Sequence, residues 1–254
     1  RSRCCSPSWW AARPPSPSCA GPADATAVDA RSSPARLTAA GLRALSGITA
    51  DAFAAMRPFW DHLPPDPHLR DGGRYRSRRH SSFIVEAGIA TQMPHRAHWQ
   101  PVAYNALHGG FERWFEPMDD ALVAQSAWTR LLARLGTTLT AVSGKVRWFV
   151  ESHQFRVDTA GGIGRPTPEG AHRDGVDYVV VILVDRHEVK GGETRVFEAD
   201  GPSGVRFTMS EPWSALLLDD VRMIHETTPI QPAGELGWRD TLVLTFRSDG
   251  FQDP

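Results

Sequence analysis

The second half of the chain consists of short stretches in which apolar and polar residues alternate, separated by Gly, Pro, Asp and Ser. This two-residue period is typical of β-strands, and the residues between them are typical of turns. About seven such strands in roughly 110 residues predict a β-sandwich or a barrel-like jelly roll. The predicted strands are 145–157, 178–184, 194–198, 204–209, 215–218, 222–225 and 241–246. Residues 179–184 are apolar throughout, so we expect this strand at the centre of a sheet, covered on both faces.

The first half of the chain favours helices. Thr49 can cap a short helix over 50–57. A longer helix is expected over 117–135, because apolar residues recur there at helical spacing and Gly136 follows as a natural stop. The predicted fold class is therefore mainly β with flanking helices and a jelly-roll core.

The composition indicates one folded domain behind a leader. Residues 1–36 are rich in Pro, Ser and Ala, and such a segment is expected to be disordered. We expect a single domain over 37–254. Its helical part would span 37–140 and its jelly-roll core about 141–250.

Charge and cysteine content narrow the range of partners. The 28 Lys and Arg residues nearly cancel the 29 Asp and Glu residues, so no global field draws the protein to nucleic acid or to an acidic membrane. No apolar run reaches the roughly 18–20 residues that span a bilayer. All three cysteines, Cys4, Cys5 and Cys19, lie near the start, which fits a reducing compartment. We therefore predict a cytoplasmic protein with a small-molecule substrate, without a nucleic-acid or membrane partner, and leave its oligomeric state open.

The residues that carry chemistry follow the order His172-x-Asp174, His225, Arg239. Side chains two apart in an extended chain share a face, so His172 and Asp174 can meet one metal ion. With His225 they form the two-histidine, one-carboxylate set that holds Fe(II) and leaves three positions open. The guanidinium of Arg239 can grip a distant carboxylate of a keto acid with two hydrogen bonds. Arg247 lies on the same face of the predicted strand and is the alternative anchor.

This order of residues resembles the iron(II)- and 2-oxoglutarate-dependent dioxygenases, which have a double-stranded β-helix fold. The surrounding segments are similar to the bacterial free-amino-acid hydroxylases, the group of L-isoleucine 4-hydroxylase. The similar segments are 168–175, 191–194 and 239–246, with Tyr104-Asn105, Gly109-Gly110 and 73–79 upstream. The resemblance covers roughly residues 65–248.

The resemblance implies a cofactor set and a reaction. Fe(II) would be held by His172, Asp174 and His225, and the far carboxylate of 2-oxoglutarate by Arg239. Dioxygen would be the second co-substrate. The expected reaction is hydroxylation of an aliphatic C–H bond in a small free L-amino acid or related metabolite, with release of succinate and carbon dioxide.

A free amino acid needs one cationic and one anionic partner. The predicted substrate-binding residues are Arg156 and Glu169, which flank the metal motif. The arginine-rich segment 70–79 is expected to be a solvated face, with part of a substrate lid as the alternative. Two other classes stay open: a non-redox cupin-like metal protein (an isomerase or a sensor), which has no need of Arg239, and a non-catalytic β-sandwich binding module whose histidines are incidental.

Overall fold

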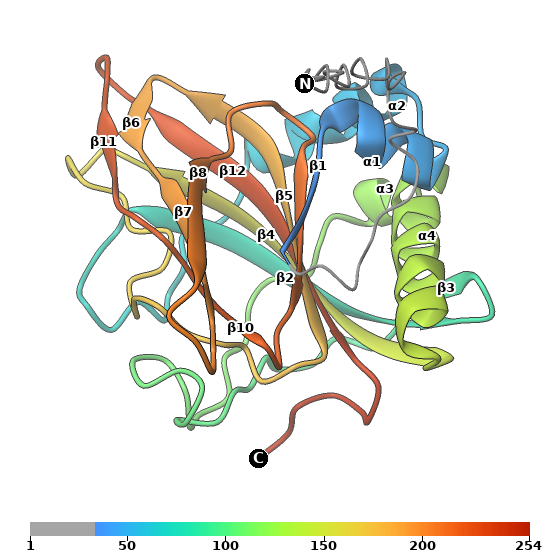
Figure 1. Cartoon of the computed structure of the whole chain (residues 1–254). Helices are drawn as coiled ribbons and strands as arrows, with labels where there is room; N and C mark the ends of the chain where they lie inside the picture. The colour runs from blue at the N-terminus through green and yellow to red at the C-terminus, as the bar shows by residue number, and fades with distance from the viewer. Residues whose placement is uncertain (1–33) are drawn as a thin grey trace, which may run out of the picture.

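The computed structural model describes residues 34–254, in which two antiparallel β-sheets pack against each other and helices cover the outside of the larger one (Figure 1). The larger sheet has the strand order β1-β9-β5-β12-β4-β2-β3. Its strands are β1 Ala35–Leu37, β9 Ala215–Asp219, β5 Tyr178–His187, β12 Trp238–Arg247, β4 Arg147–Asp158, β2 Arg76–Glu86 and β3 Ile89–Gln92. The smaller sheet consists of β10 Met223–Thr227, β7 Glu193–Glu198 and β8 Gly204–Thr208. A separate two-stranded ribbon pairs β11 Ile230–Pro232 with β6 Val189–Gly191. The predicted mainly β, jelly-roll fold is confirmed.

The central strands have two different faces. In β12, Leu242 and Leu244 join the apolar core beneath the helices, whereas Thr241 and Val243 line a cavity on the opposite face. Side chains alternate between the two faces of a strand, so one face stabilises the fold while the other is free to carry polar groups. The seven predicted strands correspond to β4, β5, β7, β8, β9, β10 and β12.

The helices pack on the outer face of the larger sheet (Figure 1). They are α1 Ala39–Ser46, α2 Ala50–Met56, the 3-10 helix η1 Arg57–Trp60, α3 Asp120–Val123 and α4 Ser126–Ser143. Thr49 caps α2 as predicted, since the backbone N–H of Ala52 donates to its hydroxyl oxygen at 3.2 Å. Trp128, Leu131 and Leu135 of α4 are fully buried in the core against the sheet.

Two predictions for the first half were wrong. Residues 37–140 are not mostly helical, because β2 and β3 lie within them. The strand period of β2 is disguised in the sequence, since its inner face carries Arg76, Arg78 and His80 in place of apolar residues. The long helix also begins later, at Ser126, and continues through Gly136 to Ser143.

Gly136 is a packing residue and not a stop. A Cβ atom at this position would lie 2.6 Å from Cγ1 of Val85, so the absence of a side chain lets α4 approach β2 closely. The helix instead ends at Gly144, whose left-handed backbone (φ 78°) closes it with a hydrogen bond to the carbonyl of Thr140.

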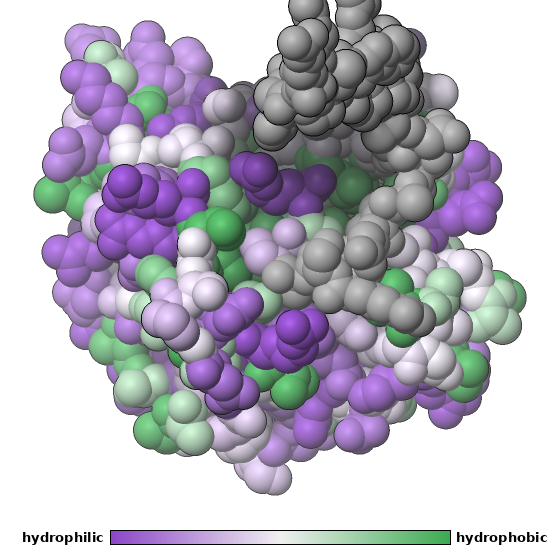
Figure 2. All heavy atoms as spheres, in the orientation of Figure 1, coloured by the Kyte–Doolittle hydropathy of each residue, from purple (hydrophilic) through white to green (hydrophobic). Residues whose placement is uncertain are grey.

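The N-terminal boundary lies earlier than predicted. Ala35 and Arg36 belong to β1, which pairs with β9, so they are part of the sheet and not of a leader. Residues 1–33 of the predicted leader, with the three cysteines, lie outside the described residues. In residues 34–254, none of the helices has the length and apolar character that crossing a membrane requires. Hydrophilic side chains cover most of the visible surface, with apolar ones scattered between them (Figure 2).

Candidate active site

A cavity lies on the inner face of the larger sheet, where the smaller sheet faces it. It is lined by inward-pointing residues of β2, β4, β5, β10 and β12 and by the loop that precedes β5. Its volume, including the open mouth, is about 860 Å³.

Three residues of the predicted metal motif meet at this cavity. His172 and His225 face each other across an antiparallel bridge, with N–H···O distances of 3.0 and 2.9 Å in the two directions. Residues paired in this way direct their side chains to the same side. The Asp174 carboxylate lies 3.9 Å from Nε2 of His172 and 3.7 Å from Nε2 of His225. One donor atom from each residue lies within 4.8 Å of the others, so a single ion can contact all three.

The backbone sets the free nitrogen of His172. Its Nδ1 lies 2.9 Å from the carbonyl oxygen of Gly170, and a carbonyl only accepts, so Nδ1 carries the proton and Nε2 keeps its lone pair. Burial alone would lower the pKa of His172, but the carboxylates of Asp174 and Glu169 outweigh it and raise that pKa. Burial lowers the pKa of His225 well below its ordinary value, which keeps this imidazole neutral.

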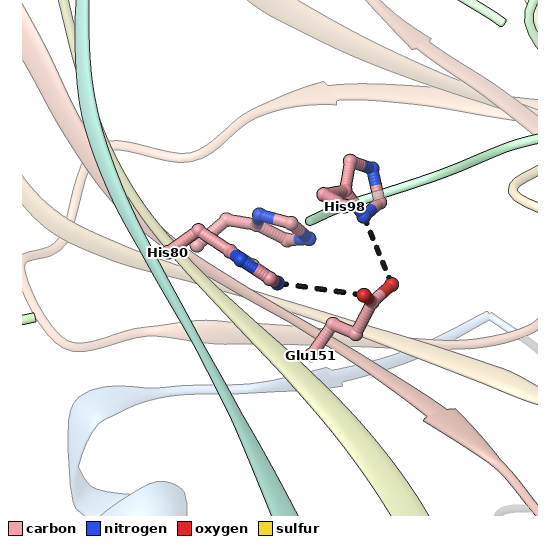
Figure 3. A group of neighbouring side chains, drawn as sticks. His80, His98 and Glu151 are labelled. Atoms are coloured by element: carbon pink, nitrogen blue, oxygen red, sulfur yellow. Dashed lines mark hydrogen bonds and ion pairs between the residues drawn. The ribbon is translucent and has the colours of Figure 1, made fainter. Parts of the chain in front are cut away.

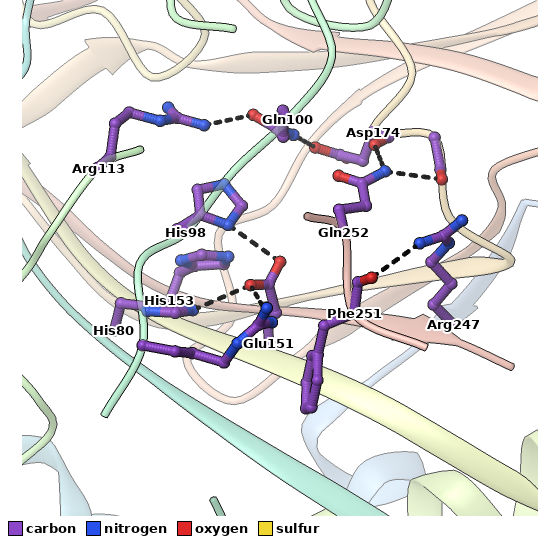
Figure 4. Close-up of polar contacts among 12 residues, drawn as sticks. His80, His98, Gln100, Arg113, Glu151, His153, Asp174, Arg247, Phe251 and Gln252 are labelled. Carbon is purple, nitrogen blue, oxygen red and sulfur yellow. Dashed lines mark hydrogen bonds and ion pairs between the residues drawn. The ribbon is translucent and has the colours of Figure 1, made fainter. Parts of the chain in front are cut away.

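The loop that carries Asp174 is held from both sides. Asp220 accepts hydrogen bonds from the backbone N–H groups of residues 174–176 at 2.8 to 3.1 Å. The side-chain amide of Gln252 donates to the carbonyl oxygens of Asp174 (3.1 Å) and Gly175 (2.9 Å) (Figure 4). Gln100 donates to the Asp174 carboxylate itself at 3.1 Å. The position of this carboxylate is therefore set before any ion binds.

Arg239 projects from β12 into the same cavity and is almost fully buried. Its Nε and Nη2 atoms have no hydrogen-bond partner among residues 34–254. Burial, with repulsion from Arg186, lowers the pKa of Arg239 to about 10, so it is still a cation at neutral pH. A buried cation with free N–H groups is a ready site for an anion.

Arg247, the alternative anchor, lies elsewhere. Its guanidinium donates to the backbone carbonyls of Gly250 (3.4 Å) and Phe251 (3.2 Å), and it does not line the cavity (Figure 4). Of the two arginines, only Arg239 shares the cavity with His172, Asp174 and His225.

Arg156, predicted to bind substrate, points away from the cavity and does not line it. It forms a two-pronged ion pair with Asp240 (2.8 and 2.6 Å) and contacts Asp61 of the helical layer at 3.1 Å. The physical reason is parity: Arg156 and Asp240 are paired across β4 and β12 on the outer face, while His153 and Phe155 lie among the inner-face residues of β4.

Glu169 does line the cavity, as a substrate-binding residue must. Its Oε1 atom lies 3.6 Å from Nε2 of His172, and its Oε2 atom is buried without a hydrogen-bond partner among the described residues. Arg113 lines the same cavity and forms no ion pair within residues 34–254. Its Nη2 donates to Gln100 at 2.7 Å, and its Nε has no partner.

The sequence interpretation missed several of the lining residues. Arg76 and Arg78 are buried against Asp66 and line the cavity, so the segment 70–79 is not a solvated face as a whole. The alternation of Arg76, Arg78 and His80 was a signal for a strand with a polar inner face. Arg113 and His98 lie in irregular segments and carried no such signal.

Comparison with known proteins supplies the family. The model of the 2OG-Fe dioxygenase family matches residues 57–245, which is most of the chain and includes every cavity residue discussed above. The chain belongs to this family. A crystal structure of a bsmA homolog from Methylobium petroleophilum PM1 is 53% identical over 86% of this chain and 90% of that chain, with a TM-score of 0.82.

More distant structures share the fold. IDO from Bacillus thuringiensis is 13% identical, covers 85% of this chain and 93% of its own, and has a TM-score of 0.65. The Fe(II)/(alpha)ketoglutarate-dependent dioxygenase TqaL is 20% identical over 83% of this chain and 82% of its own, with a TM-score of 0.61. No curated protein matches the chain.

Family membership makes Fe(II), 2-oxoglutarate and dioxygen the cofactor and co-substrates of this chain. The cavity fits them. Two imidazoles and one carboxylate converge on a point that one ion can occupy, and they are the donor set of non-haem Fe(II) oxygenases. The free N–H groups of Arg239 suit a carboxylate in the same space.

Proposed function

We propose that this dioxygenase hydroxylates an aliphatic C–H bond of a small free L-amino acid, with His172, Asp174 and His225 as iron ligands and Arg239 as the anchor of 2-oxoglutarate. The iron, once bound, supplies the oxidation of 2-oxoglutarate and of the substrate by dioxygen. The protein supplies position: the triad holds the metal, and Arg239 orients the co-substrate.

The observation that carries the substrate class is a guanidinium and a carboxylate beside the triad, each with a buried polar atom that has no hydrogen-bond partner among the described residues. Arg113 offers a guanidinium without an acidic partner, and Glu169 offers a carboxylate with one unbonded oxygen. A free amino acid is a zwitterion, so its carboxylate would form an ion pair with Arg113 and its ammonium group would form one with Glu169. Burial of either charge without such a partner costs free energy, which favours a zwitterion over an apolar substrate.

The cavity also favours a small substrate over a polymer. The polar groups that would recognise the substrate lie inside the cavity, and the net charge of the whole chain is only −1. An extended polymer would need a charged track along the surface.

The test is a screen of the free L-amino acids for succinate release from 2-oxoglutarate under air. Products are analysed by mass spectrometry for the gain of one oxygen atom. We expect one or a few aliphatic amino acids to accelerate succinate release with stoichiometric hydroxylation. Succinate release that no free amino acid accelerates, together with coupled turnover of a peptide, would contradict the proposed substrate class.

Two variants locate the zwitterion. Arg113→Lys keeps the charge but loses the planar fork, and should raise the KM for the best amino acid about tenfold. Glu169→Gln should also raise this KM about tenfold, because it removes the negative charge that would pair with the substrate ammonium group. Arg156→Lys is the matched control, because Arg156 lies outside the cavity. The KM of this variant for the same amino acid is expected to stay within about twofold of wild type.

A further inference from the structure

A second group of histidines surrounds a buried carboxylate a short way from the iron ligands. His80 on β2, His98 in the loop after β3, and Glu151 and His153 on β4 are all buried. Figure 3 shows His80 and His98 directed toward the Glu151 carboxylate. Glu151 accepts a hydrogen bond from Nδ1 of His98 at 2.9 Å, and its other oxygen lies 3.4 Å from Nε2 of His80. We call these four residues the His–Glu cluster.

The hydrogen bonds fix which nitrogens carry protons. Arg78 lies 2.7 Å from Nδ1 of His153, and a guanidinium only donates, so this Nδ1 accepts and neutral His153 carries its proton on Nε2. In the same way, a carboxylate only accepts, so His98 carries its proton on Nδ1. Burial lowers the pKa of His98 to about 4, against the pull of Glu151, so the imidazole is neutral near pH 7.

These protonation states disfavour a second metal ion, although the donor atoms of the four residues lie within 4.8 Å of one another. His153 has no lone pair left for a metal, since one nitrogen accepts from Arg78 and the other is protonated. Arg96 lies 3.9 Å from the Glu151 carboxylate and balances part of its charge. A divalent ion would have to displace these contacts and lie close to two guanidinium groups.

The cluster reaches the cavity through its histidines. His98 and His153 line the cavity, whereas His80 and Glu151 do not. His98 is paired with Arg113 in an antiparallel bridge, with both N–H···O distances at 2.9 Å, so the two side chains lie next to each other on one face. Neutral His98, whose Nδ1–H is bonded to Glu151, has its remaining lone pair on Nε2.

We propose that Glu151 is a positioning residue that fixes the tautomer and orientation of His98, and that Nε2 of His98 accepts a hydrogen bond from a donor group of the substrate beside Arg113. This proposal rests on the proposed function, in which Arg113 holds the substrate carboxylate. The group that His98 recognises is an ammonium or a hydroxyl group, because both donate a hydrogen bond close to a carboxylate.

The tautomer is tested without turnover. Histidine-selective 15N NMR on the zinc-substituted protein should show His98 protonated at Nδ1 in the wild type. Glu151→Met, which removes the acceptor at similar volume, should shift His98 toward the Nε2-protonated form. A wild-type His98 protonated at Nε2, or a tautomer unchanged in Glu151→Met, would overturn the positioning role, and so would two equivalents of tightly bound metal per chain.

The contact with substrate is tested by a matched pair of variants. His98→Phe and His80→Phe each remove one imidazole next to Glu151, but only His98 lines the cavity. We expect His98→Phe to raise the KM for the best amino acid about tenfold, with the KM for 2-oxoglutarate within about twofold and His80→Phe near wild type. Equal effects in both variants would reduce the role of His98 to packing. If His98→Phe does not fold, as judged by circular dichroism, His98→Gln replaces it.

The donor group is identified with substrate analogues. If the ammonium group is the donor, the penalty of His98→Phe should vanish for the carboxylic acid that lacks the α-amino group. If the penalty of His98→Phe persists for the analogue without the α-amino group but vanishes for a substrate without a side-chain hydroxyl, the hydroxyl is the donor. Persistence with both analogues contradicts the proposed contact. If no amino acid supports turnover, the proposed function fails, while the NMR result still decides the role of Glu151.

Discussion

The two groups of histidine and carboxylate side chains in this protein are similar in composition but different in what their lone pairs do. In the triad of His172, Asp174 and His225, the carboxylate lies 3.7 to 3.9 Å from the imidazoles, beyond hydrogen-bond distance, and the proton of His172 is directed to the Gly170 carbonyl. In the His–Glu cluster, Glu151 lies 2.9 and 3.4 Å from its imidazoles, and Arg78 binds the third histidine.

The difference teaches that residue type alone does not make a metal site. The triad leaves lone pairs free and directed at a common point, so it suits a cation. In the cluster, Glu151 accepts from His98 and Arg78 donates to His153, and the adjacent guanidinium groups of Arg78 and Arg96 supply the positive charge. The first arrangement is suited to chemistry and the second to holding a wall of the cavity in place.

The largest contrast is expected from alanine substitutions in the triad. His172→Ala, Asp174→Ala and His225→Ala should each reduce turnover about 100-fold or more and lose bound iron, because each removes a proposed iron ligand. His80→Phe in the cluster should keep one equivalent of iron. Metal analysis and succinate release are the measurements. An Asp174→Ala protein with more than about a tenth of wild-type activity would contradict the assignment.

A smaller effect separates the two arginines of β12. Arg239→Lys loses the planar fork, so the KM for 2-oxoglutarate should rise roughly 10- to 100-fold while iron affinity changes little. Arg247→Lys should leave that KM near wild type, since Arg247 bonds backbone carbonyls outside the cavity. The reverse result would show that the anchor was assigned to the wrong residue.

A further effect concerns the support of the triad. Gln252→Ala removes the two hydrogen bonds to the carbonyls of Asp174 and Gly175, and should weaken iron affinity up to about tenfold, as loss of a residue behind a ligand does. Gln154→Ala is the matched control, because Gln154 is equally buried but donates to the carbonyl of Phe59. Equal iron affinities in the two variants, by direct titration, would exclude this support role.

The smallest expected effect is the pH dependence of the cluster. Burial lowers the pKa of His98 to about 4. In the native protein this imidazole therefore stays neutral down to about pH 4, whereas in the unfolded chain it takes up a proton near pH 6.5. The unfolded state then binds more protons, and the free energy of unfolding falls as the pH drops from about 6.5 to about 4. The free energy of unfolding is measured with urea near pH 7 and near pH 5. Its decrease between these two pH values should be smaller in His98→Phe than in the wild type by about 1–2 kcal/mol. An unchanged decrease would show that His98 is not the group that titrates.

The sequence by itself determined the strands of the jelly roll and the order of the chemical residues. Alternation along β4 and β12 and the continuous apolar run of β5 are local properties, because the face of each strand that packs beneath the helices must be apolar. The spacing in His172-x-Asp174 is also local. These features could therefore be inferred without knowing what each strand faces.

Only the tertiary structure decided which charged residues share the cavity. The register of β4 with β12 directs Arg156 away from the cavity, and the bridge between His98 and Arg113 brings Arg113 to it. Neither pairing can be inferred from the local sequence. The polar inner face of β2 was likewise hidden, because its arginines are stable in the interior only where Asp66 supplies the opposite charge, and His80 lies against Glu151, which is distant in the chain. The physical reason is that a buried charge depends on its neighbours in space, and contacts between distant segments set those neighbours.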